Sequence, residues 1–208
     1  MATENLVLMG QAQDALKGKW GLAIGVFLVY IIIYCTVEFP MRSFMYGIFS
    51  IKFGFAGFII GGPFTLGLAI FSLALSRKQD AHFAQLFEGF NQFGTAFLAY
   101  LLVCIYTVLW LLLLIVPGII AAISYSQTFY IIAEDKNISP SEAIDKSKKM
   151  MDGYKMKYFY LCLRFLVLAI LCIFTFGIGF LWLFPYINVT NARFYDDLKE
   201  QVVQPVTV

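Results

Sequence analysis

The segment from Thr95 to Ala133 is a long apolar stretch that contains no Asp, Glu, Lys, Arg or His. As one α-helix rising about 1.5 Å per residue it would be roughly 58 Å long, nearly twice the hydrocarbon core of a bilayer. The segment must therefore turn back on itself. Pro117-Gly118 is the expected turn, because proline interrupts the helical hydrogen-bond ladder and glycine permits the turn.

Three other apolar segments extend this pattern along the chain. Trp20–Val37 and Phe53–Leu75 are each about one bilayer span long, and the Gly-Gly-Pro at 61–63 is expected to interrupt the second. Tyr158–Val189 again exceeds one span, and Gly177 with Gly179 supplies its turn. These lengths predict an all-α fold: a polytopic membrane helix bundle of about six transmembrane helices in three hairpins, with short amphipathic interfacial helices.

The composition excludes an ordinary soluble domain. Of the 208 residues, 61% are hydrophobic and 13% are charged, against about 25% charged in a typical soluble domain. No soluble domain is left once the apolar segments are removed, so residues 1–208 are expected to form a single membrane domain. Met1–Lys19 is polar and no cleavage-site pattern follows Trp20–Val37, so that segment is expected to be a retained span.

Residues that could carry chemistry are sparse. The cysteines Cys35, Cys104, Cys162 and Cys172 all lie in apolar segments without a C-x-x-C pair, so packed free thiols are expected. The single histidine, His82, has no companion ligand cluster, and no hydrolase, zinc or phosphate-loop motif is present. The sequence therefore predicts no catalytic residue, no metal site and no cofactor, and an enzyme is not expected.

The segments between the spans are more polar. Glu4–Gly18 is weakly amphipathic and Glu38–Lys52 is an expected loop. Ser76–Phe93 is mixed, and Asp196–Val208 is an expected frayed tail. One face of the first segment carries Leu8, Ala12, Ala15 and Leu16, and one face of the third carries Phe83, Leu86, Phe87 and Phe90.

A basic amphipathic helix is predicted to begin at Ser139. Ser139 and Glu142 form a capping box, Pro140 fits the first helical position and Gly153 is a plausible stop. Its apolar face carries Ile144, Ser147, Met151 and Tyr154, so the helix is expected to lie at a membrane surface. The candidate lipid head-group contacts are Lys146, Lys148, Lys149, Lys155 and Lys157. The alternative is ordinary positive-inside topology with solvated lysines.

An internal repeat is a further hypothesis, with units at 1–75, 76–135 and 136–200. Each unit has a glycine flanked by aromatics before a span, at Gly18, Gly89 and Gly153. In the second and third units the outgoing helices end at acids, Glu134-Asp135 and Asp196-Asp197. The alternative is that any membrane hairpin protein shows glycine turns and interfacial aromatics.

The positive charges predict an orientation. Nearly all Lys and Arg residues fall on one side of the six-span arrangement, and only Arg42 and Lys52 fall on the other. Because Lys and Arg mark the cytoplasmic side, both termini are expected in the cytoplasm.

The sequence resembles a bacterial integral-membrane family catalogued as domain of unknown function 975. The resemblance rests on V-P-G-I-I from Val116, S-E-A-I-D-K-S-K-K-M-M-D-G-Y-K from Ser141, G-I-G-F-L-W-L-F-P-Y from Gly177, and the N-terminal A-L-K-G-K-W. The family implies a multi-pass protein of the bacterial cytoplasmic (inner) membrane. It brings no established activity, so no catalytic residue is carried over. Arg164 departs from the small or polar residue expected there.

Two features within the spans are candidate sites. Polar side chains of the fourth and sixth helices could line a small polar cavity: Ser124, Tyr125, Gln127, Thr128, Tyr186, Asn188 and Asn191. The alternative is that they only join helices by hydrogen bonds. Arg164 is an intramembrane charge about 10 Å past Lys157. It is either a snorkelling side chain or a functional ion site.

Two functions remain open at this stage. The first is a non-enzymatic scaffold, accessory or lipid-organising component, favoured by interfacial helices and by the lack of buried acids within the spans. The alternative is a small permease or exporter for a lipidic or weakly polar solute, favoured by the repeat and the amides. The expected partners are membrane lipids and other membrane proteins. Nucleic acid is excluded, because Asp145 and Asp152 interleave with the lysines.

Overall fold

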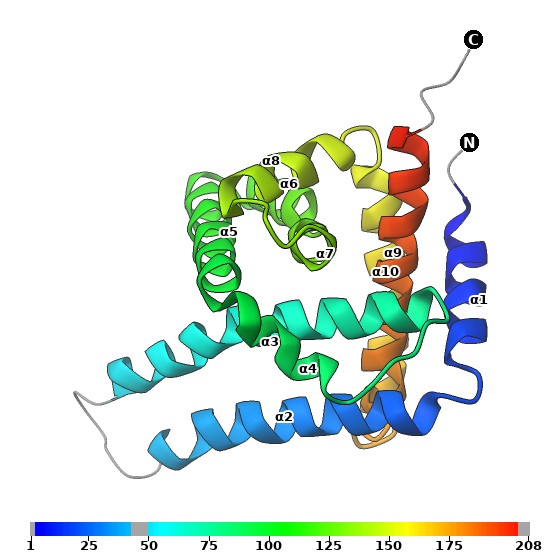
Figure 1. Ribbon diagram of the computed structural model, residues 1–208, viewed down its shortest axis with the longest axis horizontal. Helices are drawn as coiled ribbons and strands as arrows, with labels where there is room; N and C mark the ends of the chain where they lie inside the picture. The colour runs from blue at the N-terminus through cyan, green and yellow to red at the C-terminus, as the bar shows by residue number, and fades with distance from the viewer. Residues whose placement is uncertain (1–2, 43–49, 204–208) are drawn as a thin grey trace.

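The computed structural model describes residues 3–42 and 50–203, and within these ranges all regular secondary structure is helical (Figure 1). The elements are α1 (Asn5–Leu16), α2 (Trp20–Arg42), α3 (Ser50–Ser76), α4 (Gln85–Glu88), the 3-10 helix η1 (Gly89–Gln92), α5 (Phe93–Leu113), α6 (Ile115–Tyr125), α7 (Thr128–Glu134), α8 (Pro140–Met150), α9 (Lys155–Ile173) and α10 (Phe180–Val203). The predicted all-α fold is confirmed. The expected loop at 38–52 is only partly described, since α2 continues to Arg42 and residues 43–49 lie outside these ranges.

Four segments in the described ranges are long and apolar enough to cross a membrane: Gly57–Ser76, Gln85–Leu113, Ile115–Glu134 and Lys155–Ile173. A fifth is the pair α1 and α2, which passes the same test together but is bent by 96°. The chain is therefore compatible with a membrane protein. The count of about six crossings stays a prediction.

The centre of the fold is α3, which packs against α2, α5, α7 and α10. In Figure 1, α2 and α3 run side by side across the axis of α10, and α1 lies along α10. Helix α8 covers α5, α6 and α7. The face of α1 predicted to be apolar is the buried one, with Leu8, Ala12, Ala15 and Leu16 each at most 4% exposed.

The expected interruption of the second apolar segment at residues 61–63 is wrong, because α3 is continuous and contains Pro63. Membrane helices tolerate proline when neighbouring helices and Ser or Thr side chains compensate. Here the Thr65 hydroxyl donates to the Gly61 carbonyl at 2.8 Å. The glycines allow close packing: a Cβ atom on Gly62 would lie 2.6 Å from the Ala96 carbonyl oxygen of α5.

The turn expected at Pro117-Gly118 lies three residues earlier, at Leu114, whose backbone is extended (φ −162°, ψ 142°). Pro117 falls in the first turn of α6, where a missing N–H costs no hydrogen bond. Gly118 instead serves packing, since a Cβ there would overlap the Leu111 side chain on α5. The second expected turn is confirmed, with Gly177 at φ +84°.

Two expectations about segments outside the predicted spans are corrected in part. Between α3 and α5, residues 77–92 hold only the short elements α4 and η1, although Leu86 is buried and Phe87 and Phe90 contact the Phe64 ring. The tail expected to fray from Asp196 is helical to Val203 as part of α10. It is held because Leu198 is buried and because Asp196 and Asp197 form ion pairs with Arg77 and Lys157.

The predicted cap of α8 is confirmed in detail. Glu142 N–H donates to the Ser139 hydroxyl and Ser139 N–H donates to the Glu142 carboxylate. The Ser139 hydroxyl also donates to the Glu142 carboxylate at 2.7 Å, and this bond, with the one from the Ser139 N–H, holds the pKa of Glu142 below its usual range. Gly153 then ends the turn after α8 with φ +78°, and Gly18 does the same after α1 with φ +77°. Gly89 has an ordinary helical φ of −60°, so only two of the three proposed repeat junctions share this geometry.

Candidate functional site

The polar residues at 124–128 lie at a break between α6 and α7. Because the helix stops there, the Ser124 carbonyl and the Gln127 N–H lack intrahelical partners. Ser147 of α8 supplies both: its hydroxyl donates to the Ser124 carbonyl at 2.7 Å and accepts from the Gln127 N–H at 3.2 Å. Thr128 bonds to the Tyr125 carbonyl at 2.8 Å. These side chains join α6, α7 and α8 to one another.

The polar side chains of α10 lie apart from this contact. Asn188 donates to its own helix at Phe184, and Tyr186 donates to the Met9 carbonyl of α1 at 3.2 Å. Gln127 donates instead to the Ser126 hydroxyl at 3.0 Å. No hydrogen bond among the described residues joins the Gln127 and Asn188 side chains. Asn191, also on α10, is half-buried.

Parts of the predicted polar set line a small pocket of 210 Å³. Ser124 and Tyr125 form one wall with Trp110 and Pro117, and Lys148 and Lys155 contribute from the surface. Gln127, Thr128 and the three residues of α10 do not line it. The proposed single cavity between the fourth and sixth helices is thus divided between separate places in the structure.

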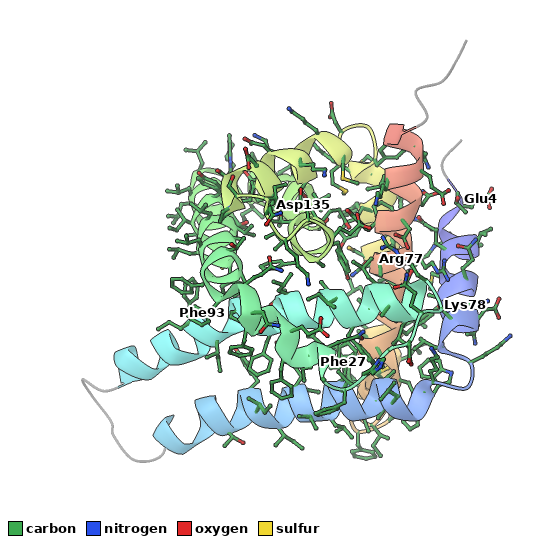
Figure 2. The ribbon with its side chains drawn as sticks, in the orientation of Figure 1. Glu4, Phe27, Arg77, Lys78, Phe93 and Asp135 are labelled. Carbon is green, nitrogen blue, oxygen red and sulfur yellow. The ribbon has the colours of Figure 1, made fainter. Side chains whose placement is uncertain are left out.

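The densest polar cluster is one that sequence reasoning did not assemble, here called the Arg77 cluster: Arg77, Glu134, Tyr195, Asp196 and Lys199. Arg77 follows α3, Glu134 ends α7, and the other three lie on α10. Figure 2 shows Arg77 where the end of α3 meets α10. The ends of three helices distant in sequence therefore meet at a single guanidinium group.

The geometry of the cluster is that of a charge-assisted network. Arg77 donates through Nη2 to Glu134 and, at 2.6 Å, to Asp196, while its Nε lies 3.1 Å from the same Asp196 oxygen. The other Glu134 oxygen accepts from the Tyr195 hydroxyl at 2.8 Å and from Lys199 Nζ at 2.7 Å. Burial would lower the pKa of Arg77, but its bonds to the two carboxylates raise it above its ordinary value.

A second ion pair lies one residue further along α10. Asp197 accepts from Lys157 Nζ at 2.6 Å and from the backbone N–H of Thr3 at 3.1 Å, and its side chain is only 8% exposed. Burial would raise the pKa of Asp197, but the bonds from Lys157 and Thr3 outweigh it and the pKa lies below its usual range. This pair ties the start of α9 and the residue before α1 to α10.

A polar cleft of about 510 Å³ opens beside the Arg77 cluster. Its walls carry charges of both signs, from Arg77, Glu134, Asp135, Lys146 and Lys199. The sequence signal that could have found it is a charge near the end of three apolar segments: Arg77 directly after α3, Glu134 at the end of α7 and Asp196 in the last third of α10. Their spacing does not reveal that the three ends converge.

The predicted lysines have different surroundings. Lys146, Lys148 and Lys149 are exposed on α8, as a head-group contact requires, although Lys146 also lines the polar cleft. Lys155 lies 3.9 Å from Asp152. Lys157 is 17% exposed and already paired with Asp197, which makes it part of the fold's internal ion pairs.

Arg164 is exposed on α9, and no ion pair to it exists among the described residues. It lines a hollow of about 480 Å³ together with Lys157 and Tyr160 of α9. The opposite wall is the start of α1, comprising Thr3, Glu4, Asn5 and Leu6. The side chain therefore lies in a hollow between two helices.

Comparison with known proteins yields one match. The family described as "Protein of unknown function (DUF975)" matches residues 1–124 and 108–202, which together are nearly the whole chain. No curated protein and no solved structure matches the chain.

Proposed function

Because this chain belongs to the DUF975 family, described only as of unknown function, we propose a function from the structure itself. The protein is a non-enzymatic integral component of the bacterial cytoplasmic membrane, and it acts as a scaffold that organises lipids or other membrane proteins around it. Its long helices are the part that meets lipid, and its charged residues hold the helix ends together.

The observation that carries this proposal is the outward apolar surface of α5 and α9. Gln85–Leu113, which contains α5, has a mean hydropathy of 2.5, and Lys155–Ile173, which is α9, has a mean hydropathy of 2.0. In each segment, only 11% of the most apolar stretch is buried in the structure. The tip of α5 exposes Leu112 at 79% and Leu113 at 69%. Exposed apolar surfaces of this kind on a soluble protein would promote association with other molecules. In a bilayer they need no cover, and they are free to contact lipid or a partner helix.

The polar groups support the scaffold over a permease. Gln127 is fully buried, and the hydroxyl groups of Ser147 and Thr128 bridge the break between α6 and α7. Four hollows of about 210, 480, 500 and 510 Å³ lie among the described residues, and neither Gln127 nor Asn188 lines any of these four. A solute path through the bundle would place such groups on a cavity wall.

The membrane orientation is part of the proposal. Both termini lie in the cytoplasm, because Lys and Arg mark that side. Reporter fusions after Asp135 and after Glu200 should therefore give cytoplasmic signals, and a fusion near Ser50 should give an external one. A cytoplasmic signal near Ser50 would contradict the orientation together with the six-span topology.

The function is tested by affinity purification from the native membrane, with copurified lipids and proteins identified. The scaffold proposal expects defined lipids or membrane proteins in constant ratio to the chain.

The second candidate is a small permease, favoured by the polar cleft beside Arg77. Purified protein in proteoliposomes should then move a weakly polar solute, and Arg77→Met should change that flux. Solute flux, together with no lipid or protein that copurifies in constant ratio, would contradict the scaffold proposal and favour the permease.

A further inference from the structure

A second, apolar hollow lies further along the same two helices, α1 and α9, that line the hollow beside Arg164. The second hollow has a volume of about 500 Å³ and is lined on α9 and the turn after it by Leu168, Leu171, Cys172 and Thr175. Its other walls are Met9, Gln13 and Trp20 from the first two helices, and Gly179, Trp182, Leu183 and Tyr186 from the start of α10 and the turn before it. We call the two hollows together the α1–α9 groove.

One face of α9 forms a wall of the whole groove. Lys157, Tyr160 and Arg164 are followed by Leu168 and Leu171 at steps of three or four residues, so their side chains share one face of the helix. The face is cationic and aromatic over its first two turns and apolar beyond them. The wall of α1 follows the same order, because Thr3–Leu6 lie opposite the cations and Met9 lies opposite the leucines.

The groove exists because α1 and α9 both pack on α10, with a space left between them. Their starting ends are held together: Asn5 donates to the Lys157 carbonyl at 2.8 Å, and Thr3 and Lys157 share Asp197. Beyond those ties, Gly179 in the turn before α10 lines the space between the two helices. Leu171, which also lines the groove, is 57% exposed, so the groove is open to the outside of the bundle.

Its dimensions fit one acyl chain. From Arg164 to Thr175 the chain advances eleven residues, roughly 16 Å at helical rise, which is about half of a hydrocarbon core of ~30 Å. One leaflet of a bilayer has this thickness. The two tryptophans, Trp20 and Trp182, supply flat apolar surface within that length.

The charge of the groove favours an anionic head group. Lys157 is satisfied by Asp197, whereas Arg164 lies about 10 Å deeper on an apolar helix and has no ion-pair partner among the described residues. A cation at that depth is costly unless an anion meets it. Glu4 also lines the outer end and opposes anions there, but it is exposed at the start of α1. A phosphodiester can accept two parallel N–H bonds from a guanidinium group.

We propose that the α1–α9 groove binds one anionic phospholipid, with its phosphate at Arg164 and Tyr160 and one acyl chain along Leu168, Leu171 and Trp182. This inference rests on the proposed membrane function, for which it names a ligand class and a site. Lipid organisation by this protein then includes one lipid held in a fixed place, in addition to the mobile lipids around α5.

The test is native mass spectrometry of the delipidated full-length protein with added dioleoyl phosphatidylglycerol or dioleoyl phosphatidylcholine. The wild-type protein should bind one phosphatidylglycerol tightly and phosphatidylcholine less tightly. Arg164→Gln should weaken phosphatidylglycerol binding about tenfold. Arg164→Lys should weaken it less than Arg164→Gln does, because lysine keeps the charge but cannot form the bidentate hydrogen bonds. Lys149→Gln, which removes an exposed cation on α8, is the matched control and should bind as the wild type does.

The apolar half is tested separately. Leu171→Trp fills the groove and should weaken both lipids alike, while soluble glycerol 3-phosphate should not compete at lipid concentrations. Equal losses in Arg164→Gln and Lys149→Gln would show diffuse charge attraction and overturn the site. Competition by glycerol 3-phosphate would overturn the acyl-chain part. Solute flux in proteoliposomes would overturn the proposed scaffold function without changing these binding ratios, so the two failures are distinguishable.

Discussion

Replacing Arg77 by methionine should lower the apparent melting temperature of the detergent-solubilised protein by roughly 5–10 °C, which corresponds to about 2–3 kcal/mol of unfolding free energy. The change leaves the Glu134 and Asp196 carboxylates near each other without their shared cation. Breaking a buried ion pair costs about 3–5 kcal/mol. The smaller value is expected here because the Arg77 side chain is 30% exposed.

The neighbouring cation provides the control. Lys78 is exposed and has no ion pair among the described residues, so Lys78→Gln should change the melting temperature by no more than about 2 °C. Glu134→Gln in the Arg77→Met background should recover part of the loss, since it removes the repulsion between the Glu134 and Asp196 carboxylates that Arg77 had offset. Costs that simply add in the double variant would mean that Arg77 and Glu134 do not act together.

Replacing Gly89 by alanine should destabilise the protein by about 2–3 kcal/mol or prevent its accumulation in membranes. Gly89 and Gly67 face each other where η1 crosses α3, so the two backbones are in contact. A Cβ atom on Gly89 would overlap the Pro63 carbonyl oxygen and lie 2.8 Å from the Gly67 nitrogen. Neither backbone atom can move without displacing a helix.

Gly94, five residues further along, is the matched control for this change. No atom lies within 4 Å of the Cβ that Gly94→Ala would add, and the residue is exposed on α5. Alanine is the better helix former, so this variant should be as stable as the wild type or up to about 1 kcal/mol more stable. Thermal unfolding and membrane yield measure both variants. A similar loss in both would indicate that helix propensity matters more than the contact between α3 and η1.

These two features perform different parts of one task. Membrane helices gain little from burying apolar surface against one another, because lipid tails are equally apolar. Close backbone contact at Gly62, Gly67 and Gly89 therefore fixes how α3 meets its neighbours. The Arg77 cluster then joins the ends of α3, α7 and α10, where water and charge are available. The proposed scaffold function would require this kind of fixed arrangement to present α5 and α9 to the bilayer.

What the sequence by itself determined about this protein is its local structure and its class. The capping box at Ser139, the turns at Gly153 and Gly177 and the buried face of α1 were all predicted correctly. Each depends on residues a few positions apart, so its physical cause is contained in a short window. The apolar segments likewise established an all-α fold with helices long enough for a membrane.

Only the tertiary structure decided which elements meet. Arg77 reaches Glu134 and Asp196, which are 57 and 119 residues away, and no periodicity encodes that meeting. The polar set centred on Gln127 and Asn188 is divided because Ser147 satisfies the α6–α7 break, while Asn188 bonds within α10. An apolar pattern specifies that a face is covered but does not specify by which of several similar helices. The neighbours of α3 are set by close backbone contact at Gly62, Gly67 and Gly89 and by the ion pairs of Arg77 with Glu134 and Asp196.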